Sequence, residues 1–94
     1  MKTFEQLTRR EKSVLLIWGN YLDFSTSAHY PIEKVKKKLR NSLSEIRDID
    51  IKRMIKTLIN SGFFVRHPTG RNETYGLTIR GLKCCNILKR ENSI

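Results

Sequence analysis

The apolar residues between positions 32 and 58 fall on two helical stripes that one straight helix cannot bury together. The first stripe lies within a sector of about 80° and consists of Ile32, Val35, Leu39, Leu43 and Ile46. The second stripe is rotated from the first by about 110° and consists of Ile51, Met54, Ile55 and Leu58. An amphipathic helix turns one stripe toward a core. The sequence therefore predicts two helices, over residues 32–46 and 49–61, with a break between them.

Local signals place this break near residues 47–50. Asp48 or Asp50 is suited to cap the second helix, because a short carboxylate accepts hydrogen bonds from the free amides of a first turn. The run from Ser42 to Glu45 also fits a capping box and would place the break earlier. The jump in phase between the two stripes favours the later position.

The remaining elements follow from caps and alternation. Thr8 and Glu11 form a capping box that begins a helix over residues 9–23, with Trp18 on its buried side. Gly62 is the expected left-handed stop of the helix over 49–61. Two short apolar runs then flank a polar tip, which predicts a hairpin over residues 63–78. Its core-facing residues are expected to be Phe63, Val65, Tyr75 and Leu77.

Thr78 caps a last helix over residues 79–91. The predicted fold is mainly α with a small β-hairpin (α+β), in the order α-α-α-β-β-α, and the 94 residues make one small domain.

Two consecutive helices joined by a turn and followed by a hairpin resemble a winged helix-turn-helix domain of the MarR and PadR type. The run "IKRMIKTLINSGFFVR" resembles the recognition helix and first wing strand of these families, and "YGLTIRG" resembles the return of the wing. The resemblance implies a sequence-specific transcription regulator that binds double-stranded DNA.

The charge of the chain points to the same kind of partner. Lys and Arg number 19 against nine Asp and Glu, for a net charge of +10. A basic balance of this size in a small domain indicates a polyanion, most commonly nucleic acid. A membrane surface is the rival partner, but no basic helix with bulky aromatic residues opposite its lysines stands out. The charged start, from Met1 to Glu5, lacks the apolar stretch of a signal peptide. We expect a cytoplasmic, DNA-associated protein.

The candidate DNA contacts fall into three groups. The base-contact candidates lie on the outer side of the helix over 49–61 and its flanks, and they are Asp50, Lys52, Arg53, Lys56 and Thr57. Arg53 is the expected partner of a guanine, because a guanidinium can donate two hydrogen bonds to its major-groove edge. Phosphate-contact candidates on the preceding helix are Lys34, Lys36, Lys37, Lys38 and Arg40. Wing candidates are Arg66, His67, Arg71 and Asn72, with Arg71 expected to favour a narrow A·T-rich minor groove.

Apolar residues near the two ends of the chain exceed what one small core needs, which predicts a homodimer built from the first and last helices. The interface candidates are Phe4, Leu7, Ile79, Leu82, Cys84, Cys85, Ile87 and Leu88. The two adjacent cysteines are expected to be small, partly buried side chains near this interface, and a disulfide across the two-fold axis is the alternative.

Enzymatic chemistry has no visible support in the sequence. There is no Ser/His/Asp set, paired catalytic carboxylate, phosphate loop or cluster of metal ligands, so we expect no catalytic residue, metal or cofactor. The residues indicate no particular small-molecule effector. Two alternatives to a sequence-specific regulator stay open: a winged-helix module that binds protein, and a non-specific architectural binder of nucleic acid.

Overall fold

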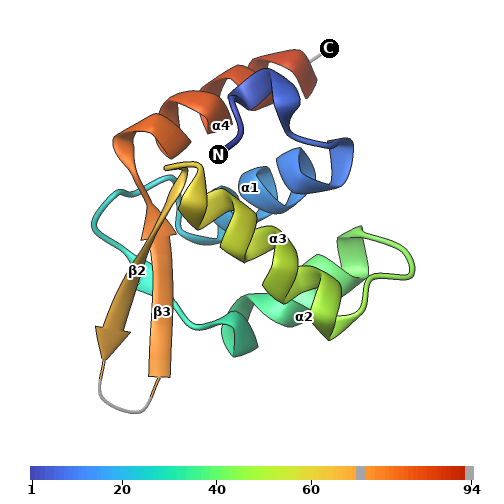
Figure 1. The fold of residues 1–94 in the computed structure, drawn as a ribbon, viewed down its shortest axis with the longest axis vertical. Coiled ribbons are helices and arrows are strands. Elements are labelled where there is room, and N and C mark those ends of the chain that lie inside the picture. Colours follow the sequence, from blue (N-terminus) through green and yellow to red (C-terminus); the bar gives the residue numbers. More distant parts are fainter. Residues whose placement is uncertain (70–71, 93–94) are drawn as a thin grey trace.

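The chain folds into four α-helices and a small antiparallel sheet (Figure 1). The structure is a computed structural model that describes residues 1–69 and 72–92, without the side chains of residues 69, 72 and 92. The elements in chain order are η1 (Phe4–Gln6), α1 (Arg9–Tyr21), β1 (His29–Tyr30), α2 (Ile32–Ser42), α3 (Asp48–Asn60), β2 (Phe64–Thr69), β3 (Asn72–Leu77) and α4 (Ile79–Asn92). Helices α2 and α3 form a helix-turn-helix, and β2 and β3 form the wing. The predicted fold class is confirmed, with η1 and β1 as additions that the sequence did not suggest.

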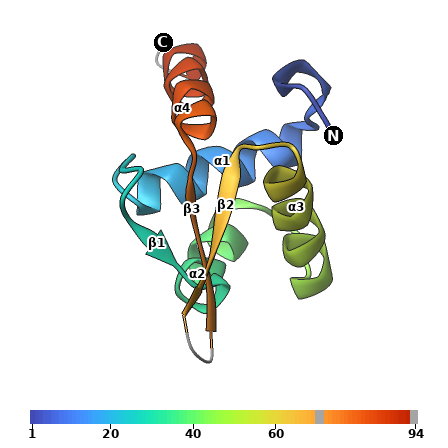
Figure 2. The ribbon, with the colours of Figure 1, turned by 60° about the vertical axis from the view of Figure 1, so that its left-hand side comes forward.

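The wing is a hairpin that projects from the end of the molecule opposite α4 (Figures 1 and 2). Its strands pair in register from Phe64 with Leu77 to Thr69 with Asn72. The two-residue strand β1 pairs with the other edge of β3, so the sheet order is β1-β3-β2. A strand exposes backbone donors and acceptors at its edge, and β1 satisfies part of that edge of β3.

The helix caps that the sequence predicted at Thr8 and Thr78 are present. The amide of Glu11 donates to Thr8 Oγ1 at 3.1 Å, and Glu11 Oε1 accepts from the amide of Thr8 at 2.8 Å. Thr78 Oγ1 accepts from the amide of Gly81 at 2.9 Å and begins α4. These contacts satisfy amides that have no partner within the helix.

Gly62 ends α3 with a left-handed backbone, at φ of +82°. The amide of Phe63 donates to the carbonyl of Leu58 at 2.9 Å, and that of Gly62 to the carbonyl of Ile59 at 3.1 Å. This pair of bonds is the Schellman motif, which turns the chain straight into β2.

The break between α2 and α3 differs from the preferred prediction. Helix α2 ends at Ser42 instead of 46, and α3 begins at Asp48. Leu43 leaves the helical conformation with an extended backbone, and Glu45 then adopts a left-handed backbone at φ of +57°. Ile46 follows this turn and lies in the core, where it is 8% exposed. Neither Asp48 nor Asp50 occupies the cap position, which belongs to Arg47. Asp50 Oδ2 instead accepts from the amide of Arg47 at 3.1 Å.

The prediction that Val65 faces the core is wrong. Phe64 is 2% exposed, whereas Val65 is 38% exposed. Phe63 is buried, as predicted, but it lies before the strand, so the alternation of β2 begins at Phe64. Phe64 therefore shares the inner face of the wing with its partner Leu77.

The core gathers side chains from α1, α2, α3, the base of the wing and α4. Trp18 lies at its centre and is fully buried. Its indole Nε1 donates to the carbonyl of Tyr75 at 3.2 Å, and its ring packs against Phe64 at 5.6 Å and Tyr75 at 6.0 Å between ring centroids. Helix α1 is thus joined to both strands of the wing.

Helix α4 starts against the base of the wing, where Gly81 leaves room for a backbone crossing. A Cβ atom at Gly81 would lie 2.1 Å from the carbonyl oxygen of Phe63, closer than any real contact. The Thr-x-x-Gly run therefore has a structural reason: Thr78 caps the helix, and Gly81 lets its first turn pass over the start of β2.

Candidate nucleic-acid interface

Helix α3 presents a basic face to solvent. Lys52, Arg53 and Lys56 are all exposed on the side opposite the core residues of this helix. Asn60 lies one turn after Lys56 and is also exposed. Residues three or four positions apart share a helix face, so these side chains form one continuous stripe.

The two flanking candidates of α3 are less exposed than the three cations. Asp50 is held at the N-terminal end of the helix by Arg47, whose Nε donates to Asp50 Oδ2 at 3.1 Å. The hydrogen bonds from the side chain and the amide of Arg47 lower the pKa of Asp50 below its ordinary value. Thr57 is half-buried. Asp50 is thus engaged by Arg47, and Thr57 is less exposed than the three cations with which the sequence grouped them.

Asp48 ties the start of α3 to α2. Its carboxylate accepts from Lys36 Nζ at 2.6 Å and from Arg40 Nη2. The hydrogen bond from Lys36 and the charge of Arg40 lower the pKa of Asp48 below its ordinary value. Two of the five phosphate-contact candidates on α2 are thus engaged within the chain, and they fix the position of α3 relative to α2.

The other three candidates of α2 are exposed to solvent. The Nζ atom of Lys34 lies 5.6 Å from the centre of the Tyr30 ring, a cation–π contact that orients this side chain. Lys37 and Lys38 follow on the next turn.

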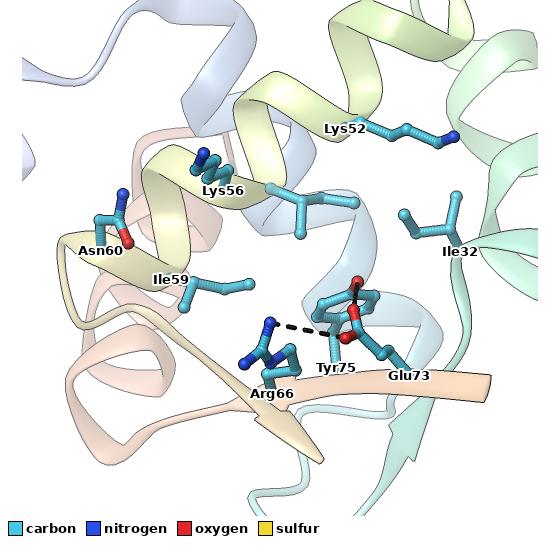
Figure 3. A pocket seen from close by; sticks show the side chains of 9 residues that line it. Ile32, Lys52, Lys56, Ile59, Asn60, Arg66, Glu73 and Tyr75 are labelled. Carbon is cyan, nitrogen blue, oxygen red and sulfur yellow. Dashed lines mark hydrogen bonds and ion pairs between the residues drawn. The ribbon is translucent and has the colours of Figure 1, made fainter. Parts of the chain in front are cut away.

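A groove separates α3 from the inner face of the wing (Figure 3). It has a volume of about 720 Å³ and is open to solvent. The lining residues are Ile32, Lys52, Ile55, Lys56, Ile59, Asn60, Arg66, Glu73 and Tyr75. Three cations and the carboxylate of Glu73 thus line this hollow together with three isoleucines.

On the wing side of the groove, an ion pair and a hydrogen bond join Arg66 and Tyr75 to Glu73. Arg66 Nη1 lies 3.5 Å from Glu73 Oε1, and the hydroxyl of Tyr75 donates to Glu73 Oε2 at 3.1 Å (Figure 3). Burial, followed by the contact with Glu73, raises the pKa of Tyr75 above its ordinary value, so the phenol stays a donor. Because Arg66 pairs with Tyr75 across the strands, both side chains lie on the face that turns toward α3.

His67 lies on the opposite face of the wing. Its ring stacks on that of His29 with 4.5 Å between centroids. Thr74 Oγ1 donates to the carbonyl of His67 at 2.8 Å and lies 2.8 Å from His29 Nδ1. Since the single hydroxyl proton goes to the carbonyl, His29 Nδ1 is the donor in the second contact. Both histidines thus help to join β1 to the wing. Arg71 lies outside the described residues, and so does the side chain of Asn72.

The dimer candidates separate into two groups. Leu7, Cys84, Cys85 and Leu88 belong to the core of this chain and are at most 7% exposed. Phe4, Leu82 and Ile87 are half-buried, and Ile79 is 69% exposed. The first group completes the contact between α1 and α4, so the apolar excess at the chain ends is smaller than the sequence suggested.

Both cysteines are free and buried. The thiol of Cys85 lies 3.5 Å from the carbonyl of Leu15, and burial raises its pKa to about 12. A disulfide between two copies, the alternative raised by the sequence, would require a cysteine to leave this core.

The sequence did not assign four residues to this region: Ile49, Asn60, Glu73 and Tyr75, of which Tyr75 was expected only as a core-facing residue of the hairpin. A helical projection of residues 49–60 would have placed Ile49 and Asn60 beside Lys56. The roles of Glu73 and Tyr75 depend on the register of the hairpin, in which Arg66 pairs with Tyr75. That register was not predicted.

Comparisons with known proteins show the fold. No family model and no curated protein matches the chain. A solved structure of the ferric uptake regulator from Pseudomonas aeruginosa with manganese is similar, with a TM-score of 0.58 and 22% sequence identity. The match covers 77% of this chain and 52% of that one, so the chain spans about half the length of this neighbour. No comparison points to the MarR or PadR families.

The described residues contain neither a metal-binding cluster nor a membrane-spanning helix. Within residues 1–69 and 72–92, no group of three or more His, Cys, Asp or Glu residues is placed to hold a metal ion. In the same part of the chain, none of the helices has the length and apolar character needed to cross a bilayer.

The contacts of Asp48 predict how stability depends on pH. A carboxylate with a lowered folded pKa stabilises the fold fully above its unfolded pKa of about 3.9, and this contribution is lost as the pH falls through the folded pKa. Urea denaturation at a series of pH values should therefore show a smaller loss of stability on acidification in Asp48→Asn than in the wild type. Asp23→Asn, which removes a carboxylate without an ion pair among the described residues, should keep the wild-type profile. Equal profiles for wild type and Asp48→Asn would contradict a stabilising contact of Asp48 with Lys36 and Arg40.

Proposed function

We propose that this chain is a sequence-specific transcription regulator that binds double-stranded DNA, with α3 in the major groove and the wing on the adjacent backbone. The observation that carries the proposal is the exposed cationic stripe of Lys52, Arg53 and Lys56 on the second helix of a helix-turn-helix. An α-helix fits the major groove, where every base pair shows a distinct pattern of donors and acceptors. The net charge of +10 suits the same partner.

The groove between α3 and the wing suits a sugar-phosphate strand. When a recognition helix enters the major groove and a wing reaches past it, the strand between them passes through this space. Lys52 and Lys56 line the groove and supply charge for phosphate oxygens, while Arg66 is paired there with Glu73. The exposed Lys34, Lys37 and Lys38 of α2 then face the neighbouring backbone, as expected for the first helix of the motif.

Binding to duplex DNA should be steeply dependent on salt. Neutralising about 6–10 phosphates implies a loss of roughly 10³–10⁵ in affinity between 50 and 200 mM salt. Fluorescence anisotropy with a labelled duplex measures this directly. A flat titration would overturn the nucleic-acid function and leave the protein-binding alternative. Equal affinity for selected and random duplexes would instead indicate the architectural binder.

Two single substitutions should separate base reading from phosphate contact. Arg53→Ala should cost about 1–3 kcal/mol of binding free energy and relax the preference at one base position per half-site. Lys37→Ala should weaken binding to all sequences alike and reduce the salt slope by roughly one per site. Both residues are exposed, so neither change should disturb the fold. Equal losses on specific and random DNA in both variants would show that α3 does not read bases.

A two-fold homodimer is part of the proposal. It would place two copies of α3 in successive major grooves, about 34–36 Å apart. Ile79, with the half-buried Leu82 and Ile87, provides the apolar surface of α4 for this contact. Sedimentation at tens of micromolar should show a dimer of the wild type and a shift toward monomer in Ile79→Lys. A monomeric wild type, with and without DNA, would refute the dimer.

A further inference from the structure

Helix α3 carries an exposed isoleucine at the N-terminal end of its cationic stripe. Ile49 is 56% exposed in the first turn of the helix. It belongs neither to the buried core nor to the half-buried residues that pack against it. Lys52, Arg53 and Lys56 follow it at spacings of three, four and seven residues, which place all four side chains on one face.

The fold supplies no structural reason for this isoleucine. A β-branched side chain is a poorer helix former than alanine or lysine, and its apolar surface here is left in water. Single exposed apolar residues are common on proteins. This one differs in its position, because the first residues of a recognition helix are those that reach base edges.

The surroundings of Ile49 leave it free to contact a ligand from solvent. Its neighbours Asp48 and Asp50 are turned to Lys36 and Arg40 and to Arg47, respectively. Their negative charges are thereby paired, and the surface around Ile49 is dominated by the cations of α3. Charge complementarity favours a polyanion as the occupant of this face.

We infer that Ile49 contacts the 5-methyl group of a pyrimidine in the major groove and thereby selects a methylated base at one position of each half-site. This inference rests on the proposed function and adds a determinant of sequence preference to it. The thymine methyl is the apolar group that base pairs present in the major groove, and 5-methylcytosine carries the same group there. An isoleucine cannot donate or accept a hydrogen bond, so its contribution to recognition is the removal of apolar surface from water.

The test removes the methyl group from the DNA and its partner from the protein. A preferred duplex is first selected from a randomised pool with wild-type protein. Each thymine is then replaced by deoxyuridine and each cytosine by 5-methylcytosine, one at a time, and Kd is measured at fixed salt. At one position per half-site, losing the thymine methyl should weaken wild-type binding by about 3- to 10-fold, or adding the cytosine methyl should strengthen it by as much.

The variants decide whether Ile49 is the cause. Ile49→Ala should bind the methylated and unmethylated duplexes equally, and Ile49→Val should keep part of the difference. Val65→Ala, which truncates an exposed β-branched residue outside α3 and outside the proposed dimer contact, should keep the full wild-type difference. Alanine favours a helix, so Ile49→Ala is expected to fold.

The outcomes separate this inference from the proposed function. A methyl effect that depends on Ile49 supports it, with the deoxyuridine and methylcytosine arms identifying the base. A wild type that selects a sequence but ignores every methyl group, or an Ile49→Ala variant that keeps the effect, overturns it and leaves the regulator function standing. A wild type that binds no duplex overturns both.

Discussion

The contact of Trp18 with the base of the wing is the one on which the rest of the structure depends. Its indole donates a hydrogen bond to the backbone of Tyr75, and its ring packs against Tyr75 and Phe64, one from each wing strand. A two-stranded hairpin is marginally stable alone in water. Its attachment to α1 through a fully buried tryptophan fixes the wing, and with it the width of the groove beside α3.

Acidic residues complete this scaffold by holding particular cations in place. Asp48 holds two cations of α2, Asp50 holds Arg47, and Glu73 holds Arg66. Exposed ion pairs of this kind contribute little to stability. They instead affect the geometry and the electrostatic field of the surface. They orient the helix-turn-helix and neutralise the cations that they pair with, whereas the cations of α3 face solvent. The likeness to the ferric uptake regulator concerns this scaffold, and the proposed reading of DNA rests on the side chains of this chain.

Much of the fold was predictable because its signals are local. The capping box at Thr8, the left-handed stop at Gly62 and the cap at Thr78 each involve residues within a few positions of one another. The end of α2 was misplaced because the phase of the apolar stripe persists to Ile46, although the helix itself ends earlier. Val65 was assigned to the core because alternation was counted from Phe63, and the tight exit from α3 shifts the start of the strand by one residue.

The sequence by itself determined the order of the four α-helices and the two wing strands, the existence of a break between two helices and the strong positive charge, since periodicity, caps and composition act along the chain. Only the tertiary structure decided which charged groups are paired, as in the clamp of Asp48 on Lys36 and the contact of Arg66 with Glu73. It also decided that Cys85 and Leu88 are buried within the chain while Ile49 is exposed. Pairing and burial depend on segments distant in sequence coming together. A shift of one strand by one residue, or a rotation of one helix, would change which side chains are paired and which are buried.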